Sequence, residues 1–79
     1  MSNPFAPNPV ANLTDPNTPG ELLRYGMKSR SQRRFVVVFF DGNGTPRVHA
    51  RSDNYSTAKG KTHSSSFVAF VVDRVGGQA

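Results

Sequence analysis

Hydrophobic and polar positions mark out one β-hairpin near the middle of the chain. After the leading arginine, residues 34–40 are all β-branched or aromatic, a composition typical of a strand. Residues 46–52 alternate, with Val48 and Ala50 on one face and basic side chains on the other. Residues 41–44, Asp-Gly-Asn-Gly, supply the glycine and asparagine that tight turns favour. The pattern predicts two antiparallel strands, at about 34–40 and 46–52.

The length of the turn decides which side chains share a face of this hairpin. With Asn43 and Gly44 as a two-residue turn, Val37 pairs with Ala50 and Phe40 pairs with Arg47. One face is then wholly apolar. The other face mixes apolar and basic side chains: Val36, Val38, Phe40, Arg47, His49 and Arg51. A three-residue turn would exchange these faces, because side chains alternate along a strand.

Further elements flank the hairpin. Thr18-Pro19-Gly20-Glu21 has the spacing of a capped helix start and Gly26 can end the helix, which predicts a short helix near 19–25. Residues 53–66 are polar and are expected to form a loop. The segment 67–75 stays open between a third strand, which its valines favour, and a covering helix, which its helical-wheel pattern favours. The expected fold class is α+β, a small antiparallel sheet built on the hairpin.

The N-terminal segment differs in composition from the rest of the chain. Five of the six prolines lie in the first 23 residues, where no lysine or arginine occurs. Proline fixes φ and pushes the preceding residue toward extended backbone, so residues 1–18 are expected to form an extended, flexible arm. Residues 19–76 are then a single small basic domain, and residues 77–79 a short tail.

The predicted strand 34–40 is apolar on both faces, so both faces are expected to be buried. A sheet with two apolar faces needs a layer on each side. The helix near 19–25 can cover one face. If 67–75 is a strand, the other face has no cover within the chain, and self-association or docking on a partner is expected to bury it.

The distribution of charge narrows the choice of partner. The net charge is +5, and residues 24–61 carry nine lysines and arginines against two aspartates. Such a concentration of positive charge attracts polyanions, so nucleic acid (DNA or RNA) is the first choice and an acidic protein surface the second. A solvated face that only keeps the chain in solution is the alternative interpretation.

The mixed face of the hairpin supplies the candidate contacts. An exposed aromatic ring beside arginines can stack a base while the guanidinium groups contact phosphates. Alternatively, the apolar side chains of that face lie under another element or subunit, with the arginines at its rim. The candidate nucleic-acid-binding residues are basic or aromatic and lie in or beside the hairpin and the segment after it: Arg33, Arg34, Phe40, Arg47, His49, Arg51, Lys59 and Lys61.

No motif in the chain predicts catalysis. Cysteine is absent, which excludes a disulfide framework and a thiolate metal site. Gly60-Lys61-Thr62 matches the end of a phosphate-binding loop, but Tyr55 stands where that motif needs a glycine. We therefore expect a non-enzymatic protein without cofactor or metal. The first residues lack the features of a secretory signal, and the apolar run 35–40 is too short to cross a membrane. A cytoplasmic location, in a bacterium or a host cell, is expected.

Within the hairpin, Asp41, Gly44 and Arg47 have the spacing Asp-x-x-Gly-x-x-Arg. Over residues 35–51 the hairpin resembles those of the DNA-binding arm domains of phage integrases and of short ββα repeat domains of bacterial proteins. The first resemblance implies strands that enter a DNA major groove.

A Pro/Asn-rich arm on a small basic β-domain is also similar in build to small phage virion and host-takeover proteins. That build implies a rival role as a structural or assembly protein, or as an inhibitor of a host protein. In this role the arm and the apolar strands dock on protein, and a virion location becomes an alternative.

Overall fold

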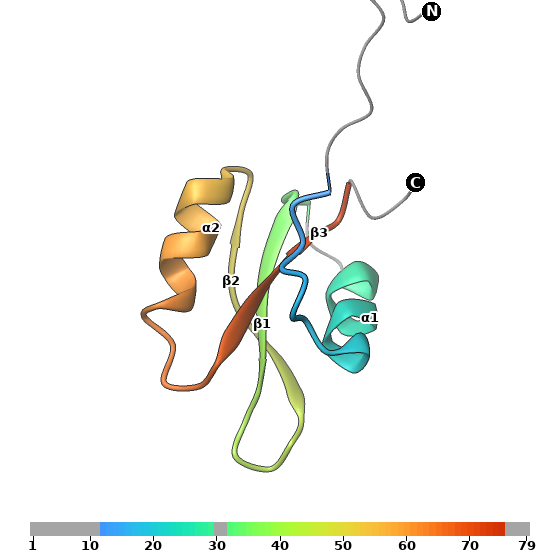
Figure 1. Cartoon of the computed structure of the whole chain (residues 1–79), viewed down its shortest axis with the longest axis vertical. Helices are drawn as coiled ribbons and strands as arrows, with labels where there is room; N and C mark the ends of the chain where they lie inside the picture. The colour runs from blue at the N-terminus through green and yellow to red at the C-terminus, as the bar shows by residue number, and fades with distance from the viewer. Residues whose placement is uncertain (1–11, 30–31, 76–79) are drawn as a thin grey trace, which may run out of the picture.

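The computed structural model describes residues 12–29 and 32–75. Its elements, in chain order, are α1 (Gly20–Lys28), β1 (Phe35–Phe40), β2 (Pro46–Ser52), α2 (Tyr55–Thr62) and β3 (Ala69–Asp73). The strands form one antiparallel sheet in the order β2-β1-β3. The helices α1 and α2 lie on opposite faces of this sheet (Figure 1). The predicted α+β fold with a central hairpin is confirmed, and the segment 67–75 contains a strand.

On one face, α1 packs against the branched side chains of the sheet. Leu22 of α1 is fully buried with Val36, Val38 and Val72, and half-buried side chains surround them: Leu23, Met27, Phe40, Val48 and Phe70. Burying a leucine completely contributes about 1.5–3 kcal/mol, which offsets the low intrinsic stability of a two-turn helix.

The start and the end of α1 differ from the prediction. The N-cap is Pro19, whose ring offers no hydrogen-bond acceptor, and Thr18 precedes it with its hydroxyl donating to the backbone oxygen of Asp15. Gly26 does not end the helix, which continues to Lys28. Gly26 is buried, and a Cβ at this position would lie 2.9 Å from the Cβ of Val72. The glycine therefore permits close approach of helix and sheet.

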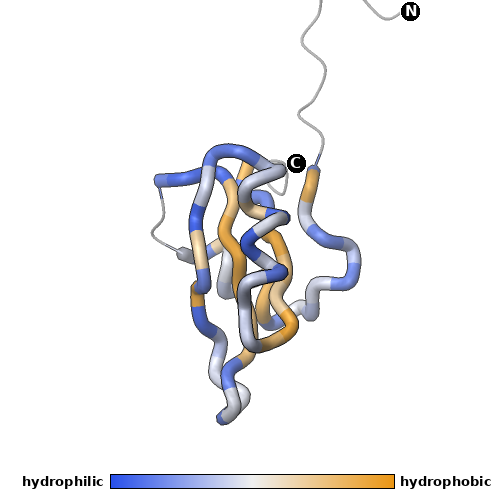
Figure 2. Tube along the Cα trace, turned by 90° about the vertical axis from the view of Figure 1, so that its left-hand side faces the viewer, coloured by the Kyte–Doolittle hydropathy of each residue, from blue (hydrophilic) through white to orange (hydrophobic). Residues whose placement is uncertain are grey.

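On the other face, α2 covers a second cluster that contains Phe35, Val37, Ala58 and Val71. The expected loop at 53–66 was wrong for residues 55–62. Asn54 caps this helix by accepting a hydrogen bond from the Thr57 N–H, 3.1 Å away. Ala58 is the buried residue of α2, and its small side chain lets a mostly hydrophilic helix lie close to the apolar strands (Figure 2).

The hairpin register also differs from the prediction. The chain turns through Gly42–Gly44, with hydrogen bonds from the Asp41 N–H to the Thr45 oxygen and from the Gly44 N–H to the Asp41 oxygen. Gly44 has a φ of 77°, a conformation that glycine adopts without steric cost. Phe40 therefore pairs with Pro46, and Phe39, not Phe40, pairs with Arg47.

A bulge then restores part of the predicted register. The pairing shifts between Val37 and Val38, so that Val38 faces Val48 while Val37 faces Ala50 as predicted. His49 is the extra residue on β2. The turn register puts Val48 among the side chains under α1, and the bulge keeps Ala50 among those under α2, so both apolar residues of β2 reach a core.

The described part of the N-terminal segment lies along the outer edge of β3 (Figure 1). The Asp15 N–H donates to the Val71 oxygen at 2.9 Å, and the Asp73 N–H donates to the Thr14 hydroxyl at 2.8 Å. Residues 13–15 thus occupy backbone groups that an edge strand would otherwise leave open. Residues 1–11 of the expected arm and the whole expected tail, 77–79, lie outside the described residues.

Both faces of β1 are covered within the chain, one by α1 and one by α2. Self-association was expected on the assumption that a strand at 67–75 would leave one face bare. That assumption was wrong, because α2 supplies the second cover. Within residues 12–29 and 32–75, no helix has the length and hydrophobicity that a membrane span requires.

Candidate nucleic-acid interface

The topology brings arginines from distant parts of the sequence to one end of the sheet. Both outer strands run antiparallel to β1, so Phe35, the first residue of β1, pairs with Ser52 near the end of β2 and with Asp73 at the end of β3. Within two residues of these three positions lie four arginines, here called the basic end: Arg33, Arg34, Arg51 and Arg74. Two aspartates, Asp53 and Asp73, lie among them.

Arg34 and Asp73 form the structural part of the basic end. Arg34 donates from Nε to Oδ1 of Asp73 at 3.0 Å and from Nη2 to Oδ2 at 2.8 Å, a bidentate pair. Asp73 is fully buried and also accepts the backbone N–H groups of Leu13 and Val75. The hydrogen bond to Asp73 raises the pKa of Arg34 above its ordinary value. The Asp73 carboxylate thereby joins its own segment to those of Leu13 and Arg34.

Arg33 is paired in a more exposed way. Its Nη1 lies 2.8 Å from Oδ2 of Asp53, and both side chains are more than half exposed. The Arg33 guanidinium, followed by the Arg34 backbone N–H, lowers the pKa of Asp53 below its ordinary value. Exposed ion pairs contribute little to stability, so a phosphate can replace Asp53 as the partner of Arg33 at small cost.

The other two arginines complete the basic end from the outer strands. Arg74 donates its backbone N–H to the Arg34 oxygen at 2.9 Å and Nη1 to the Arg33 oxygen at 3.2 Å. Arg51 is exposed on β2 opposite Val36 and makes no ion pair with any acidic residue in the described part of the chain. Arg51 is therefore the member whose charge is most available to a ligand.

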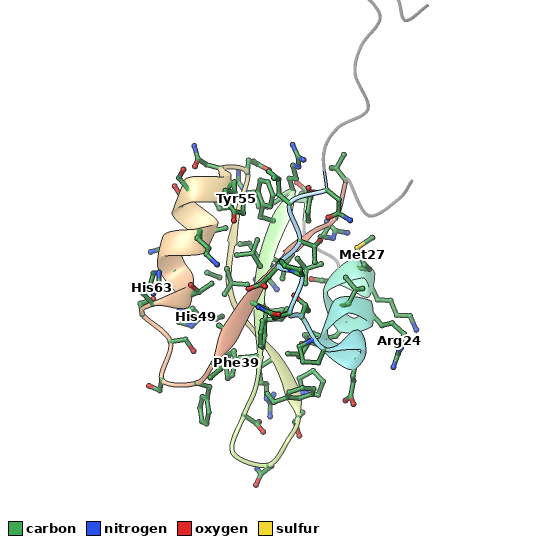
Figure 3. The ribbon with its side chains drawn as sticks, viewed as in Figure 1. Arg24, Met27, Phe39, His49, Tyr55 and His63 are labelled. Carbon is green, nitrogen blue, oxygen red and sulfur yellow. The ribbon has the colours of Figure 1, made fainter. Side chains whose placement is uncertain are left out.

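An exposed aromatic ring borders the basic end. The Arg34 guanidinium carbon lies 4.8 Å from the centre of the Phe35 ring, and the Phe35 ring meets the Tyr55 ring edge-on with centroids 5.7 Å apart. Phe35 is buried, whereas Tyr55, the first residue of α2, is 37% exposed. Figure 3 shows Tyr55 beside the start of α2, on the same side of the sheet as that helix.

A second aromatic cluster lies at the opposite end of β1, also on the α2 side. Phe39 stacks on Phe67 with centroids 5.4 Å apart and meets His49 edge-on at 6.2 Å. His49 Nε2 lies 3.0 Å from the Ser64 hydroxyl, which fixes the ring near the end of α2 (Figure 3). Phe67 is 43% exposed. The cluster therefore presents the Phe67 ring to solvent.

Arg47 is the arginine nearest to this cluster along the sheet, because it pairs with Phe39 on β1. Its Nε lies 3.0 Å from Oδ2 of Asp41. The Thr45 backbone N–H, followed by the Arg47 side chain, lowers the pKa of Asp41 below its ordinary value. Asp41 thus stabilises the turn as well as the position of Arg47.

The three-residue turn and the bulge together separate residues that were predicted to share one face. Phe40 packs in the cluster under α1, and Arg47 and His49 lie on the α2 side at the hairpin end of the sheet. Arg51 lies at the basic end, toward the α1 side. The predicted face that joins Phe40 to these three residues was therefore wrong. The structure instead brings Arg51 together with Arg33 and Arg34.

The two lysine candidates lie on α2, in its last turn. Lys59 Nζ is 3.8 Å from Oδ2 of Asp15, and Lys61 makes no ion pair with a described acidic residue. Both side chains are exposed. They lie along the sequence between the two exposed rings, Tyr55 and Phe67.

Arg74 at the basic end and the exposed rings of Tyr55 and Phe67 were not predicted from the sequence. Tyr55 follows Asn54, whose capping hydrogen bond to Thr57 begins α2, so the Asn-x-x-Thr spacing was the available signal. Nothing in the local pattern around Arg74 indicates its place beside Arg33, because 41 positions separate the two residues.

The described residues enclose no pocket and gather no group of three histidine, cysteine or acidic side chains that could hold a metal ion. No protein-family model, curated protein or solved structure matches this chain.

Proposed function

We propose that this protein binds nucleic acid through the basic end of its sheet. The observation that carries the proposal is the convergence of Arg33, Arg51 and Arg74 from three separate chain segments on one end of a small fold. Among the residues that the structure describes, the acidic side chains at this end are Asp53 and Asp73, so the four arginines leave an excess of positive charge there. Phosphate groups are the ligands that planar, multidentate guanidinium groups favour.

The test is a salt titration of binding, measured by fluorescence anisotropy with labelled single-stranded and duplex DNA and RNA. Binding that depends on phosphate contacts weakens with salt, with a log–log slope of about −0.9 per contact on duplex DNA and about −0.7 on single strands. Arg51→Gln should weaken binding and reduce the size of this slope by about one contact. Arg51 makes no ion pair with described acids, so its loss should leave folding intact.

Arg24→Gln is the matched control. It removes the same charge from the outer side of α1, away from the sheet (Figure 3), and should leave the slope unchanged. If Arg24→Gln and Arg51→Gln weaken binding equally, net charge and not the basic end is responsible. Absence of binding at about 50 mM salt would contradict the proposal and leave the structural or assembly role, with a protein partner.

A further inference from the structure

The exposed rings of Tyr55 and Phe67 lie on the α2 side of the sheet, and each is supported in the same way. Each outer ring lies against an inner phenylalanine of β1, Tyr55 against Phe35 and Phe67 against Phe39. The inner rings belong to the same strand and the same face, four residues apart. At about 3.3 Å per residue they are separated by roughly 13 Å.

Positive charge accompanies each ring. At the Tyr55 end, the Arg34 guanidinium lies over the Phe35 ring. Arg33 is close to Arg34, because the Arg33 side chain and the Arg34 backbone N–H both bind the Asp53 carboxylate. At the Phe67 end, Arg47 pairs with the inner ring's residue, Phe39. The exposed lysines of α2, Lys59 and Lys61, come between the two ends in the sequence. Rings with flanking cations are suited to a ligand that alternates flat apolar groups with anions.

We propose that the ligand is single-stranded nucleic acid, with one base stacked on Tyr55 and another on Phe67. This inference rests on the proposed function and adds the class of ligand and its path. Bases can stack on side chains only when they are free of a duplex, as they are in a single strand. The inner rings, Phe35 and Phe39, set the scale of this path: at the 3.4 Å rise of a stacked strand, their separation of roughly 13 Å corresponds to about four nucleotides.

The hairpin itself is poorly suited to the other mode, entry into the major groove of a duplex. Its tip, Gly42 to Gly44, carries no positive charge. The nearest arginine, Arg47, is paired with Asp41 behind the tip. Readout of base edges in a groove needs side chains that reach beyond the backbone, and this tip offers only Asn43.

The decisive experiment uses the full chain and oligonucleotides of about eight nucleotides, roughly twice the proposed span, as single strand and as duplex. Tyr55→Leu and Phe67→Leu remove the ring and keep an apolar side chain. Each should weaken single-strand binding by about five-fold or more, because stacking contributes about 1–3 kcal/mol per base and 1.4 kcal/mol is tenfold in affinity. The salt slope should not change, because no phosphate contact is lost.

Tyr25→Leu is the matched control, because Tyr25 is equally exposed but lies on α1, on the opposite face of the sheet. It should leave binding unchanged. This control variant also retains Tyr55 as its single tyrosine and the chain has no tryptophan. Its intrinsic fluorescence therefore reports on Tyr55 alone, and the single strand should quench it. This readout does not depend on whether the ring-deleted variants fold.

The outcomes separate this inference from the function on which it rests. If the chain binds duplex as tightly as single strand, the Tyr55 fluorescence does not respond and Arg51→Gln still weakens binding, the proposed function stands and the inference is overturned. If no nucleic acid binds at about 50 mM salt, both fail together. Preference for the single strand, with losses at both rings and quenching of Tyr55, supports the inference.

Discussion

Gly26 shows how a single missing methyl group sets the distance between α1 and the sheet. Alanine at this position would place its Cβ within 3.0 Å of three carbon atoms of Val72, one of them the Val72 Cβ. That Cβ is attached to the backbone and cannot rotate away. Either the helix or the strand must move, although the fold holds both by buried contacts on Leu22 and Val36.

We expect Gly26→Ala to lower the free energy of unfolding by about 1–3 kcal/mol, the usual cost of overpacking a core. This runs against helix propensity, which favours alanine over glycine by about 1 kcal/mol. The measurement is urea unfolding followed by circular dichroism. Gly60→Ala is the control, because nothing lies within 4 Å of a Cβ there.

In α2 the propensity term acts alone, so Gly60→Ala should raise the free energy of unfolding by about 0.5–1 kcal/mol. A stabilising effect of equal size at Gly26 would show that α1 does not pack tightly against Val72.

At the scale of elements, the three-residue turn and the bulge act together on the hairpin. The turn puts Phe40 opposite Pro46, and the bulge at His49 lets Ala50 still face Val37. Without the bulge, the part of β2 beyond it would turn over, and Ala50 would face the α1 side instead of the α2 side. The register of the hairpin therefore depends on Gly44, whose φ of 77° makes the turn.

Gly44→Ala should lower the free energy of unfolding by about 1 kcal/mol, the cost of the left-handed conformation for a residue with a Cβ. Gly42→Ala is the matched control two residues earlier: it has equally open surroundings and no positive φ. Thermal unfolding of the two variants should show a lower midpoint for Gly44→Ala alone. Equal midpoints would mean that the turn relaxes to another type.

The elements differ in how much of them the sequence predicts. The hairpin strands and α1 carry strong local signals, an unbroken β-branched run in one case and a proline-led start in the other. α2 carries almost none, because it buries only Ala58 and contains Gly60 in its interior. This segment is stabilised as a helix by packing on an apolar face of the sheet, and that contact cannot be seen in the local sequence.

The candidate site was also only partly predictable, because some of its features depend on composition and others on tertiary structure. The concentration of basic residues could be counted, and Arg33, Arg34 and Arg51 do lie at one end of the sheet. The pairing of Phe40 with Arg47 failed because it depended on turn length. The position of the Tyr55 ring could not be predicted without α2. The location of Arg74 beside Arg33 could not be predicted without knowing that β3 pairs with β1.

At the scale of the whole molecule, buried valines and a few carboxylates stabilise the fold together. The pKa values of Asp41 and Asp53 are both lowered in the folded state by arginines and backbone N–H groups. In the unfolded chain these carboxyls have ordinary pKa values near 3.9. The unfolded state therefore binds more protons as the pH falls through about 4, and the stability that the two carboxylates contribute above this pH is lost below it.

We expect the free energy of unfolding to be level above about pH 5 and to fall below about pH 4. Asp41→Asn and Asp53→Asn should each be less stable near neutral pH and lose less on acidification, with the double variant flattest of all. Urea midpoints between about pH 2.5 and 6 give the comparison. An acid decline as steep in the double variant as in the parent chain would show that other carboxyls dominate.

The contacts of β3 also have a consequence for the order in which the chain can fold. Asp73 accepts the N–H of Leu13 across 60 positions of sequence, and Val72 completes the cluster of Leu22 and Val36. During synthesis β3 is the last of the five elements to emerge. Until then α1 lacks part of its packing surface, residues 13–15 have no edge to lie on, and the valines of β1 stay exposed on one side. We therefore expect a nascent chain halted before β3 to be the form that chaperones and proteases bind.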